Sequence, residues 1–322
     1  MARQDWTPDP EQMALMPEIS GNAINGLGEA ERRRPRPVYW ALDPADIPHG
    51  QAQLWFYRQN DHPDLNALRA ARKAEEAIPL PPVTAPSGTP DDRTAADWTD
   101  RIAAQARALG AEAVGIARVD PDWAYDGGDL PWRFIIVMAI AMDYDTMAQA
   151  PELAAGVEVV RQYGRGMTTA KALAGWLRRQ GHDAVCEHGP FTGALTLIPA
   201  AIAAGLGELG KHGSLINRDL GSMFRLTAVL TNLDLVPDAP DSFGADGFCG
   251  ACRICENACP PGAILREKQT VRGETRWYVD FDRCLPYFNE TAGCAICLSA
   301  CPFSRPGIGS NLVAKLARRA PR

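Results

Sequence analysis

The sequence predicts a mixed α/β (α+β) fold, in which a layered core of strands and helices precedes a small cysteine-rich module. Three observations lead to this prediction. Residues 134–140 form a continuously apolar run, which is typical of a strand buried on both faces by helices. Apolar residues from Trp98 to Leu109 recur at helical spacing and stop at Gly110. Eight of the nine cysteines lie between residues 249 and 301.

Composition narrows the class of protein further. The 322 residues are enough for one large domain or two modest ones, and 46% of them are hydrophobic. The formal net charge of −6 argues against general nucleic-acid binding, which needs a surplus of Lys and Arg. The apolar stretches are too short or too interrupted to span a membrane as a helix. The N-terminal residues do not resemble a signal peptide, so we expect a protein of the reducing cytoplasm.

The chain divides into four segments. The first is residues 1–95, which are rich in proline and charge and end in a proline-rich linker from Pro79 to Asp91. Residues 96–240 form the α/β domain, and residues 241–310 form the cysteine-rich module. Residues 311–322 are a basic tail that is either a short helix or disordered.

Local patterns place the remaining elements in order. We expect helices over residues 66–77, 97–109, 168–180 and 199–206, with Gly181 ending the third. Strands are expected over residues 113–117, 134–140 and 223–230, and an extended segment runs through Cys186.

The cysteine spacing predicts two iron–sulfur clusters. The first run, from Cys249 to Pro260, reads Cys-x2-Cys-x2-Cys-x3-Cys-Pro, which is the bacterial ferredoxin spacing. In that pattern three thiolates bind one cluster and the fourth binds its neighbour. The second run repeats the tail of the motif and ends at Pro302, with a longer gap after its first cysteine. We assign one [4Fe–4S] cluster to Cys249, Cys252, Cys255 and Cys301, and the other to Cys259, Cys284, Cys294 and Cys297.

Other uses of these cysteines fit less well. Disulfides belong to secreted domains, and no export signal is expected here. Structural zinc sites favour paired Cys-x2-Cys units, whereas a triple run followed by Cys-Pro suits two separate tetrahedra poorly. The ninth cysteine, Cys186, is expected to be a small buried hydrophobic residue.

A glycine-rich segment, residues 205–213, precedes the cysteine motif. Alone it indicates either a tight turn or a close approach of backbone to a phosphate or a ring edge. The order in which this segment and residues 110–125, 137–144 and 231–238 follow one another along the chain is more specific evidence than the glycine-rich segment alone. Over residues 97–306 this order resembles the corrinoid-dependent reductive dehalogenases and, more distantly, the epoxyqueuosine reductases.

The resemblance implies a nitroreductase-like α/β core that holds a base-off cobalamin and receives electrons from a ferredoxin-like module with two [4Fe–4S] clusters. It also implies that residues 1–95 cover the corrinoid and the substrate. We expect the cofactor-binding residues in the glycine-rich segment, at Gly205, Gly207, Gly210 and Lys211. No histidine lies in an Asp-x-His-x-x-Gly context, so the cobalt would have no protein axial ligand and one face would stay open for substrate.

Two catalytic residues follow from the same resemblance. Tyr163 is the candidate proton donor, and Arg225 is the candidate cation that stabilises the developing phenolate. Lys211 or Arg165 could supply that charge instead. The alternative interpretation is structural, because a tyrosine near a helix often packs or caps, and an arginine on a strand often faces solvent.

The aromatic residues Trp40, Trp55 and Phe56 line a substrate pocket or fill the core.

Two other functions stay open at this point. Residues 163–166 also resemble the Tyr-x-Arg-Gly segment of epoxyqueuosine reductases, although Thr168 stands where that family places an acidic residue. A non-catalytic two-cluster electron carrier is the second alternative. For an enzyme we expect a small-molecule substrate and a separate low-potential donor such as ferredoxin or flavodoxin. The bond cleaved is carbon–halogen, or a related ether or epoxide bond.

Overall fold

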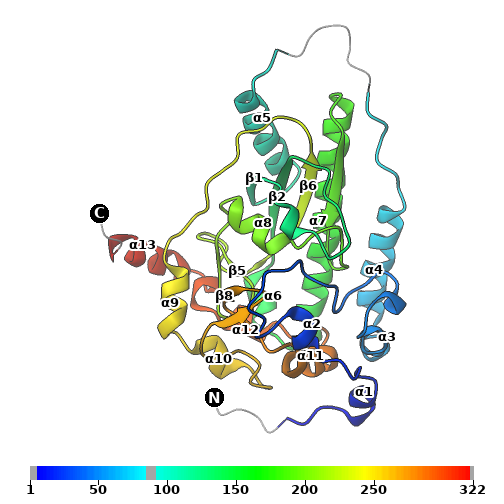
Figure 1. Cartoon of the computed structure of the whole chain (residues 1–322), viewed down its shortest axis with the longest axis vertical. Coiled ribbons are helices and arrows are strands. Elements are labelled where there is room, and N and C mark those ends of the chain that lie inside the picture. Colours follow the sequence, from blue (N-terminus) through cyan, green and yellow to red (C-terminus); the bar gives the residue numbers. More distant parts are fainter. Residues whose placement is uncertain (1–5, 85–91, 320–322) are drawn as a thin grey trace.

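A four-stranded antiparallel sheet forms the centre of the chain in the computed structural model, which describes residues 6–84 and 92–319 (Figure 1). The strand order is β1-β2-β6-β3, and every neighbouring pair is antiparallel. The strands are β1 (Ala113–Arg118), β2 (Phe134–Ala141), β3 (Ala184–His188) and β6 (Phe224–Thr231). The predicted strands are therefore confirmed, as is the mixed fold class.

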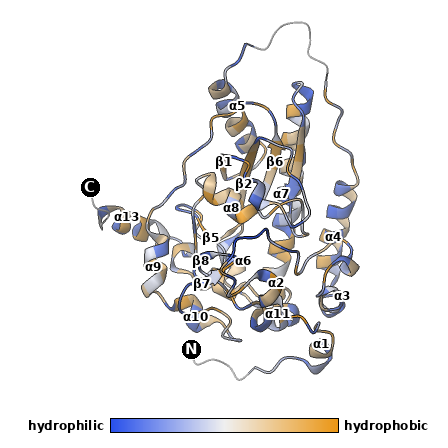
Figure 2. Ribbon diagram, viewed as in Figure 1, coloured by the Kyte–Doolittle hydropathy of each residue, from blue (hydrophilic) through white to orange (hydrophobic). Residues whose placement is uncertain are grey.

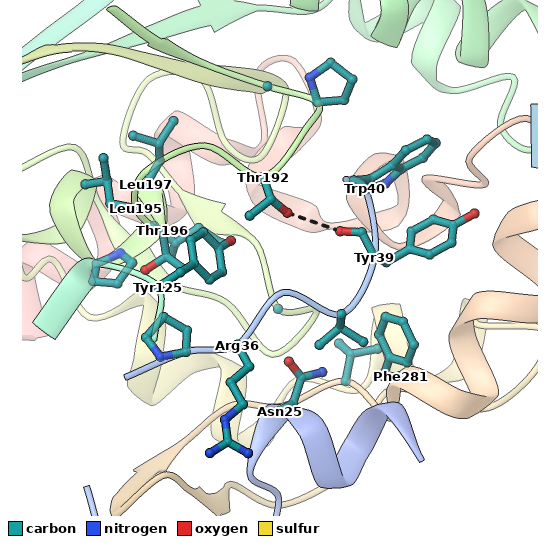
Figure 3. Close-up of a pocket in the computed structure, with 18 of the residues that line it drawn as sticks. Asn25, Arg36, Tyr39, Trp40, Tyr125, Thr192, Leu195, Thr196, Leu197 and Phe281 are labelled. Carbon is teal, nitrogen blue, oxygen red and sulfur yellow. Dashed lines mark hydrogen bonds between the residues drawn. The ribbon is translucent and has the colours of Figure 1, made fainter. Parts of the chain in front are cut away.

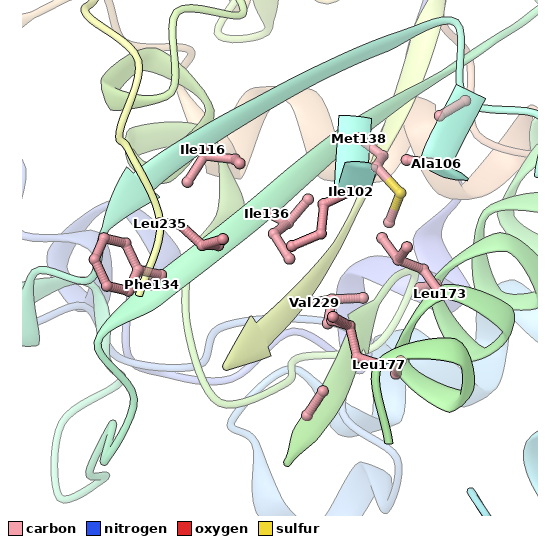
Figure 4. Close-up of a cluster of buried hydrophobic side chains, with 14 of the residues drawn as sticks. Ile102, Ala106, Ile116, Phe134, Ile136, Met138, Leu173, Leu177, Val229 and Leu235 are labelled. Carbon is pink, nitrogen blue, oxygen red and sulfur yellow. The ribbon is translucent and has the colours of Figure 1, made fainter. Parts of the chain in front are cut away.

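Helices cover both faces of this sheet, as the apolar run in β2 predicted. On one face α5 (Ala95–Ala108) and α7 (Leu153–Arg179) pack on the strands, with Ile102, Ile136 and Leu173 fully buried between them (Figure 4). On the other face lies α8 (Leu197–Ala203). Figure 2 shows hydrophobic residues on the central strands and hydrophilic ones on the outward side of α4 and α5. Short elements η2 (Pro121–Trp123) and α6 (Tyr144–Met147) connect the layers.

The helix α7 is much longer than the sequence indicated. It begins at Leu153, whereas the expected helix began near residue 168. Gly164 and Gly166 lie inside this longer helix, and Gly166 lets the helix approach Ile140 and Thr227 of the sheet closely. As a result Tyr163 lies inside the helix and not before it.

The N-terminal segment wraps around the rest of the chain. It contains α1 (Pro10–Ala14), α2 (Gly21–Asn25), η1 (Pro44–Asp46), α3 (Gly50–Gln59) and α4 (Pro63–Glu76). The helix α4 packs against α7. The Asn22 amide donates to Asp280 at 2.8 Å and accepts from the Phe281 N–H at 2.8 Å, which ties α2 to the cysteine-rich module.

The cysteine-rich module is built from short helices and one hairpin. Its elements are α9 (Ala245–Ala251), α10 (Ile254–Ala258), β7 (Gln269–Val271), β8 (Glu274–Arg276), α11 (Phe281–Glu290), α12 (Ile296–Ala300) and η3 (Pro302–Ser304). A small pair, β4 (Glu208–Leu209) with β5 (Leu215–Ile216), joins it to the sheet domain. The tail forms the helix α13 (Gly309–Arg319). Leu312 and Leu316 of this helix pack against the module.

Part of the predicted proline-rich linker, residues 85–91, lies outside the described residues, as do residues 320–322 of the tail. Within residues 6–84 and 92–319, no helix combines the length and apolar character needed to cross a membrane.

Candidate active site and cluster-binding module

The structure brings the cysteines of each predicted group near one another, while their assignment as ligands of two clusters stays a prediction. In the first group, burial and the neighbouring Cys301, Cys249 and Cys252 thiols raise the pKa of Cys255 to about 12. Burial, with Cys301 and Cys252 nearby, raises the pKa of Cys249 to about 11. Cys249 lies on α9, Cys255 lies on α10, and Cys301 follows α12, so three separate elements converge.

The second group gathers in the same way. Burial and the Cys294 and Cys259 thiols raise the pKa of Cys284 to about 12. Burial also raises the pKa of Cys297 well above its ordinary value, with Cys294, Cys284, Cys255 and Cys259 as its neighbours. Because Cys297 is close to Cys255 of the first group, the two groups adjoin.

This donor set suits cubane clusters better than single ions. Four thiolates held together out of water repel one another, so cationic iron is needed to stabilise them. In the described parts of the chain, no three His, Cys, Asp or Glu side chains meet at a point that one metal ion could occupy. In a [4Fe–4S] cluster each of four cysteines binds its own iron, so a cluster needs four thiolates, the number in each predicted group. The Ala263 N–H donates to the Cys259 sulfur at 3.3 Å, a bond that stabilises a thiolate.

Lys211 lies beside the first cysteine group. Its side chain is 1% exposed, its Nζ donates to the Cys252 carbonyl at 3.0 Å, and it lies 5.0 Å from the centre of the Trp277 ring. The glycines before it pack against backbone, since a Cβ at Gly205 or Gly207 would meet the carbonyl of Ala239 or Ile216. The structure therefore places Lys211 and these glycines at the module boundary and outside the lining of the main cavity, and Gly210 lies with them. Their cofactor-binding role stays a prediction.

The main cavity, of about 620 Å³, lies between the sheet domain, the N-terminal segment and the cysteine-rich module (Figure 3). Its volume is in the range of binding sites for sizeable organic ligands. Tyr39, Trp40, Tyr125 and Phe281 form much of its aromatic wall, as Figure 3 shows. Cys284 of the second cysteine group also lines this cavity.

Tyr163 reaches the cavity from α7. Its ring packs so closely on Gly189 that a Cβ there would lie 2.4 Å from Tyr163 Cε1. Behind it, the Arg225 guanidinium on β6 lies 5.2 Å from the centre of the Tyr163 ring. Of the three cations considered, Arg225 is thus beside the tyrosine, whereas Arg165 pairs with Glu112 on the far side of α7 and Lys211 contacts Trp277.

Burial perturbs the ionisable groups around the cavity. It raises the pKa values of Glu187 and Tyr125 and lowers that of His188. Three buried nitrogens at or behind the wall have no hydrogen-bond partner among the described residues: His188 Nδ1, Arg225 Nε and Arg276 Nε. His188 and Arg276 line the cavity itself, so their polar side chains fit a ligand that is rich in polar groups, as the amide-bearing rim of a corrinoid is.

The aromatic residues considered earlier divide between wall and core. Trp40 lines the cavity and has a left-handed backbone with φ 67°, which is strained for so bulky a residue. Trp55 and Phe56 are buried behind it, at 1% and 5% exposure, and do not line the cavity. Cys186 is half-buried on β3, where burial raises its pKa.

Comparison with known proteins agrees with this site. Residues 248–304 match the family described as "4Fe-4S dicluster domain", which covers all eight grouped cysteines. Over 225 residues the chain is 32% identical to the tetrachloroethene reductive dehalogenase of Desulfitobacterium hafniense, covering 66% of this chain and 40% of that protein. The chain is a relative of the reductive dehalogenases. The enzyme of the same name from Sulfurospirillum multivorans is 28% identical over 266 residues, 68% of this chain and 52% of that one.

A solved catabolic reductive dehalogenase, NpRdhA in complex with 3-bromo-4-hydroxybenzoic acid, superposes with a TM-score of 0.76. At 24% identity, over 95% of this chain and 47% of that one, this match shows the fold. Epoxyqueuosine reductases are relatives too, the Synechocystis enzyme being 33% identical over 164 residues, 45% of this chain and 52% of that one. The chain spans about 40% to 50% of the length of the dehalogenases it matches.

Sequence reasoning missed several residues of this site. Gly189, His188, Arg276 and Trp277 all line the cavity, yet none belongs to a motif. The only local signal was the Gly189-Pro190 pair, which indicates a turn. Partners distant in the sequence determine the other positions, as the contact of Gly189 with Tyr163 illustrates.

Proposed function

We propose that this chain is a cytoplasmic, cobalamin- and iron–sulfur-dependent reductase that cleaves a carbon–halogen bond in a small organic molecule. One observation carries the proposal: a single cavity is lined both by Tyr163, the candidate acid, and by Cys284, a candidate cluster ligand. A group bound there would be within reach of a proton and of electrons at once.

Relatives support the choice of cofactor. A solved reductive dehalogenase that is 26% identical, with a TM-score of 0.68 over 85% of this chain and 40% of that one, is described as B12-dependent. In this chain the polar side chains of His188 and Arg276, together with the aromatic wall, would hold the macrocycle. When bound, the corrinoid would supply low-potential cobalt for breaking the carbon–halogen bond, with electrons from the two clusters.

The chain's own residues would complete the reaction. Replacing halogen by hydrogen consumes two electrons and one proton and releases halide. Tyr163 is placed to give that proton from its phenol oxygen to the substrate carbon. The Arg225 charge behind the ring stabilises the negative charge left on the tyrosine.

The cavity wall favours a flat, apolar substrate. Tyr39, Trp40, Phe281 and Phe288 present ring faces and edges to the cavity, and such surfaces bind aromatic molecules well. We infer a halogenated aromatic compound. Its electrons would come from a separate low-potential donor such as ferredoxin or flavodoxin.

Epoxyqueuosine reduction is less well supported. The Thr168 hydroxyl donates to the Gly164 carbonyl of its own helix at 3.2 Å and does not line the cavity. A threonine in that position cannot replace an acidic residue as proton donor at neutral pH.

The test begins with cofactor content. Protein purified without oxygen and reconstituted with iron, sulfide and hydroxocobalamin should retain cobalt in about one-to-one ratio and release bromide from brominated phenols with a strong one-electron reductant. Iron uptake without any cobalt would instead indicate a two-cluster electron carrier. Cobalt uptake without halide release would support corrinoid binding but refute the proposed dehalogenation.

A further inference from the structure

A second cavity, of about 110 Å³, adjoins the main one on the side of the β7–β8 hairpin. Six residues line both cavities: Pro35, Thr196, Pro199, Val271, Arg272 and Arg276. Two of these are arginines from one hairpin, so a pair of guanidinium groups stands at the junction of the cavities.

The hairpin turn presents Arg272 in an unusual way. Arg272 and Gly273 form its two-residue loop, with φ 49° and 77°, which corresponds to a type I′ turn. That turn favours Asn or Gly at its first position, so an arginine there has a backbone cost. The side chain reaches back under α2, where Nη1 donates to the Asn25 carbonyl at 2.6 Å.

Neither arginine has a carboxylate partner among the described residues. The nearby acids are engaged elsewhere: Glu274 pairs with Arg32 at 2.6 Å and Glu29 pairs with Arg33 at 2.6 Å. Arg276 Nε is buried without a hydrogen-bond partner. Burial lowers the pKa of both groups, and the Arg276 and Arg33 charges lower that of Arg272 further, whereas the Glu274 charge raises the pKa of both arginines.

Two poorly solvated guanidinium groups with no carboxylate in direct contact are costly, and an anion between them reduces that cost. Arg36, which also lines the main cavity, adds a third cation, although it pairs with Asp126 at 3.1 Å. Acidic residues do line the second cavity, namely Asp120, Asp122 and Glu274. None of these three acids lines the main cavity, so an anion can approach the arginine pair from that side.

We propose that Arg272 and Arg276 form an oxyanion site that binds a phosphate ester or carboxylate of the molecule in the main cavity. The arginine pair is observed independently, and only the identity of that molecule rests on the proposed function. Two sources share this chemistry. One is the phosphodiester of a cobalamin, and the other is a carboxylate on the substrate.

The variants are Arg272→Asn, which keeps a residue suited to the turn, and Arg276→Gln. Arg266→Gln is the matched control, because it removes an equal charge from an exposed arginine that lines neither cavity. Binding of hydroxocobalamin and of dicyanocobinamide, which lacks the nucleotide and its phosphate, is followed by absorbance. Binding of 4-hydroxybenzoate and of phenol is followed by tryptophan fluorescence.

Each outcome decides between the sources. A loss of about tenfold to a hundredfold for hydroxocobalamin, with dicyanocobinamide unchanged, assigns the site to the phosphodiester. The same loss for 4-hydroxybenzoate, with phenol unchanged, assigns it to a substrate carboxylate. If both variants bind all four probes as the wild type and the control do, the oxyanion site is refuted while the proposed function stands.

Failure of the proposed function gives a different pattern. If the wild type binds neither corrinoid, inorganic phosphate still tests the arginine pair. Phosphate should raise the melting temperature of the wild type above that in chloride of equal ionic strength, and this rise should disappear in both variants. An equal rise in wild type and variants would overturn the inference.

Discussion

The guanidinium carbon of Arg225 lies 5.2 Å from the centre of the Tyr163 ring, although the two residues belong to a helix and a strand far apart in the sequence. Tyr163 faces the cavity, and Arg225 lies behind it and outside the cavity lining. This arrangement separates a residue that can touch a ligand from one that acts through its neighbour. It leads to different expectations for the two side chains.

Tyr163→Phe should abolish most halide release, because it removes the proton donor and keeps the ring. A general acid contributes about 100-fold to 10,000-fold in rate. The measurement is bromide release under single turnover, with cobalt and iron contents determined on the same sample. Tyr57→Phe is the control, since Tyr57 contacts Trp40 and Arg69 but does not line the cavity. Equal rates for Tyr163→Phe and wild type would remove the tyrosine from the mechanism.

Arg225→Gln should reduce the rate less, by roughly 30-fold, which corresponds to about 2 kcal/mol of charge stabilisation. Arg225→Lys should restore much of that loss because it keeps a positive charge near the ring. If Arg225 had only a packing role, the Gln and Lys variants would release halide at about the same rate. The measurement is the rate of halide release under single turnover for the wild type and both variants, with cobalt and iron contents determined on the same samples.

Gly189→Ala should impair activity by displacing Tyr163, since the new Cβ would lie 2.4 Å from Tyr163 Cε1. We expect a loss of at least tenfold in halide release, with both clusters retained. Gly164→Ala is a close control, being next to Tyr163 on α7 with no atom within 4 Å of the added Cβ. That variant should gain up to about 1 kcal/mol of stability from better helix propensity. Similar activities for the two alanine variants would contradict this account.

Several features of the fold and of the candidate site were predictable from local sequence. The apolar run of β2 predicted the centre of the sheet domain, and the cysteine spacing predicted a two-cluster module, because each signal depends on residues that are close together in the chain. The predicted start of α7 was wrong, because the first half of this helix is stabilised by packing against the sheet, as the contacts of Gly166 with Ile140 and Thr227 show, and local sequence does not reveal such packing. The bonds from Asn22 to Asp280 and Phe281 were not predictable, because they join residues 258 or more positions apart.

Cys284→Ala should remove about half of the bound iron, because Cys284 belongs to the group with Cys259, Cys294 and Cys297. Since it also lines the cavity, halide release should fall with the lost cluster. Cys186→Ala, on β3, should keep all iron and lose about 1 kcal/mol of stability or less. Electron paramagnetic resonance of the reduced protein, with iron analysis, distinguishes the two. Full iron content in Cys284→Ala would contradict the assignment.

His212 should make the protein sensitive to mild acid. Burial lowers its pKa from 6.5 to about 4, so the folded chain keeps the ring neutral while the unfolded chain binds a proton below pH 6.5. The unfolded state therefore binds more protons, and stability falls as the pH drops from 6.5 toward 4, by about 3 kcal/mol at most.

Urea unfolding between pH 7.5 and 5.5, followed by tryptophan fluorescence, measures this. His212→Gln should lower stability at pH 7.5, because the bond to the Ser222 hydroxyl at 3.0 Å changes, yet flatten the pH dependence. His62→Gln, an exposed substitution at the start of α4, should leave the wild-type slope unchanged. An unaltered slope in His212→Gln would assign the acid sensitivity to other groups.

Lys211 should raise the reduction potential of the cluster that we assign to Cys249, Cys252, Cys255 and Cys301. Its ammonium is buried and donates to the Cys252 carbonyl, and a fixed positive charge favours the state that has gained an electron. Lys211→Met should therefore lower that potential by about 50 mV, the size of an interaction of about 1 kcal/mol for a one-electron couple.

Lys268→Met is the matched control for Lys211→Met. Its ammonium lies 5.3 Å from the same Trp277 ring, but it pairs with Asp246 at 2.7 Å and is one-third exposed, so water and that carboxylate screen it. Redox titrations monitored by electron paramagnetic resonance should show a clear shift only for Lys211→Met, and equal shifts in the two variants would mean that the buried contact with Cys252 has no special effect.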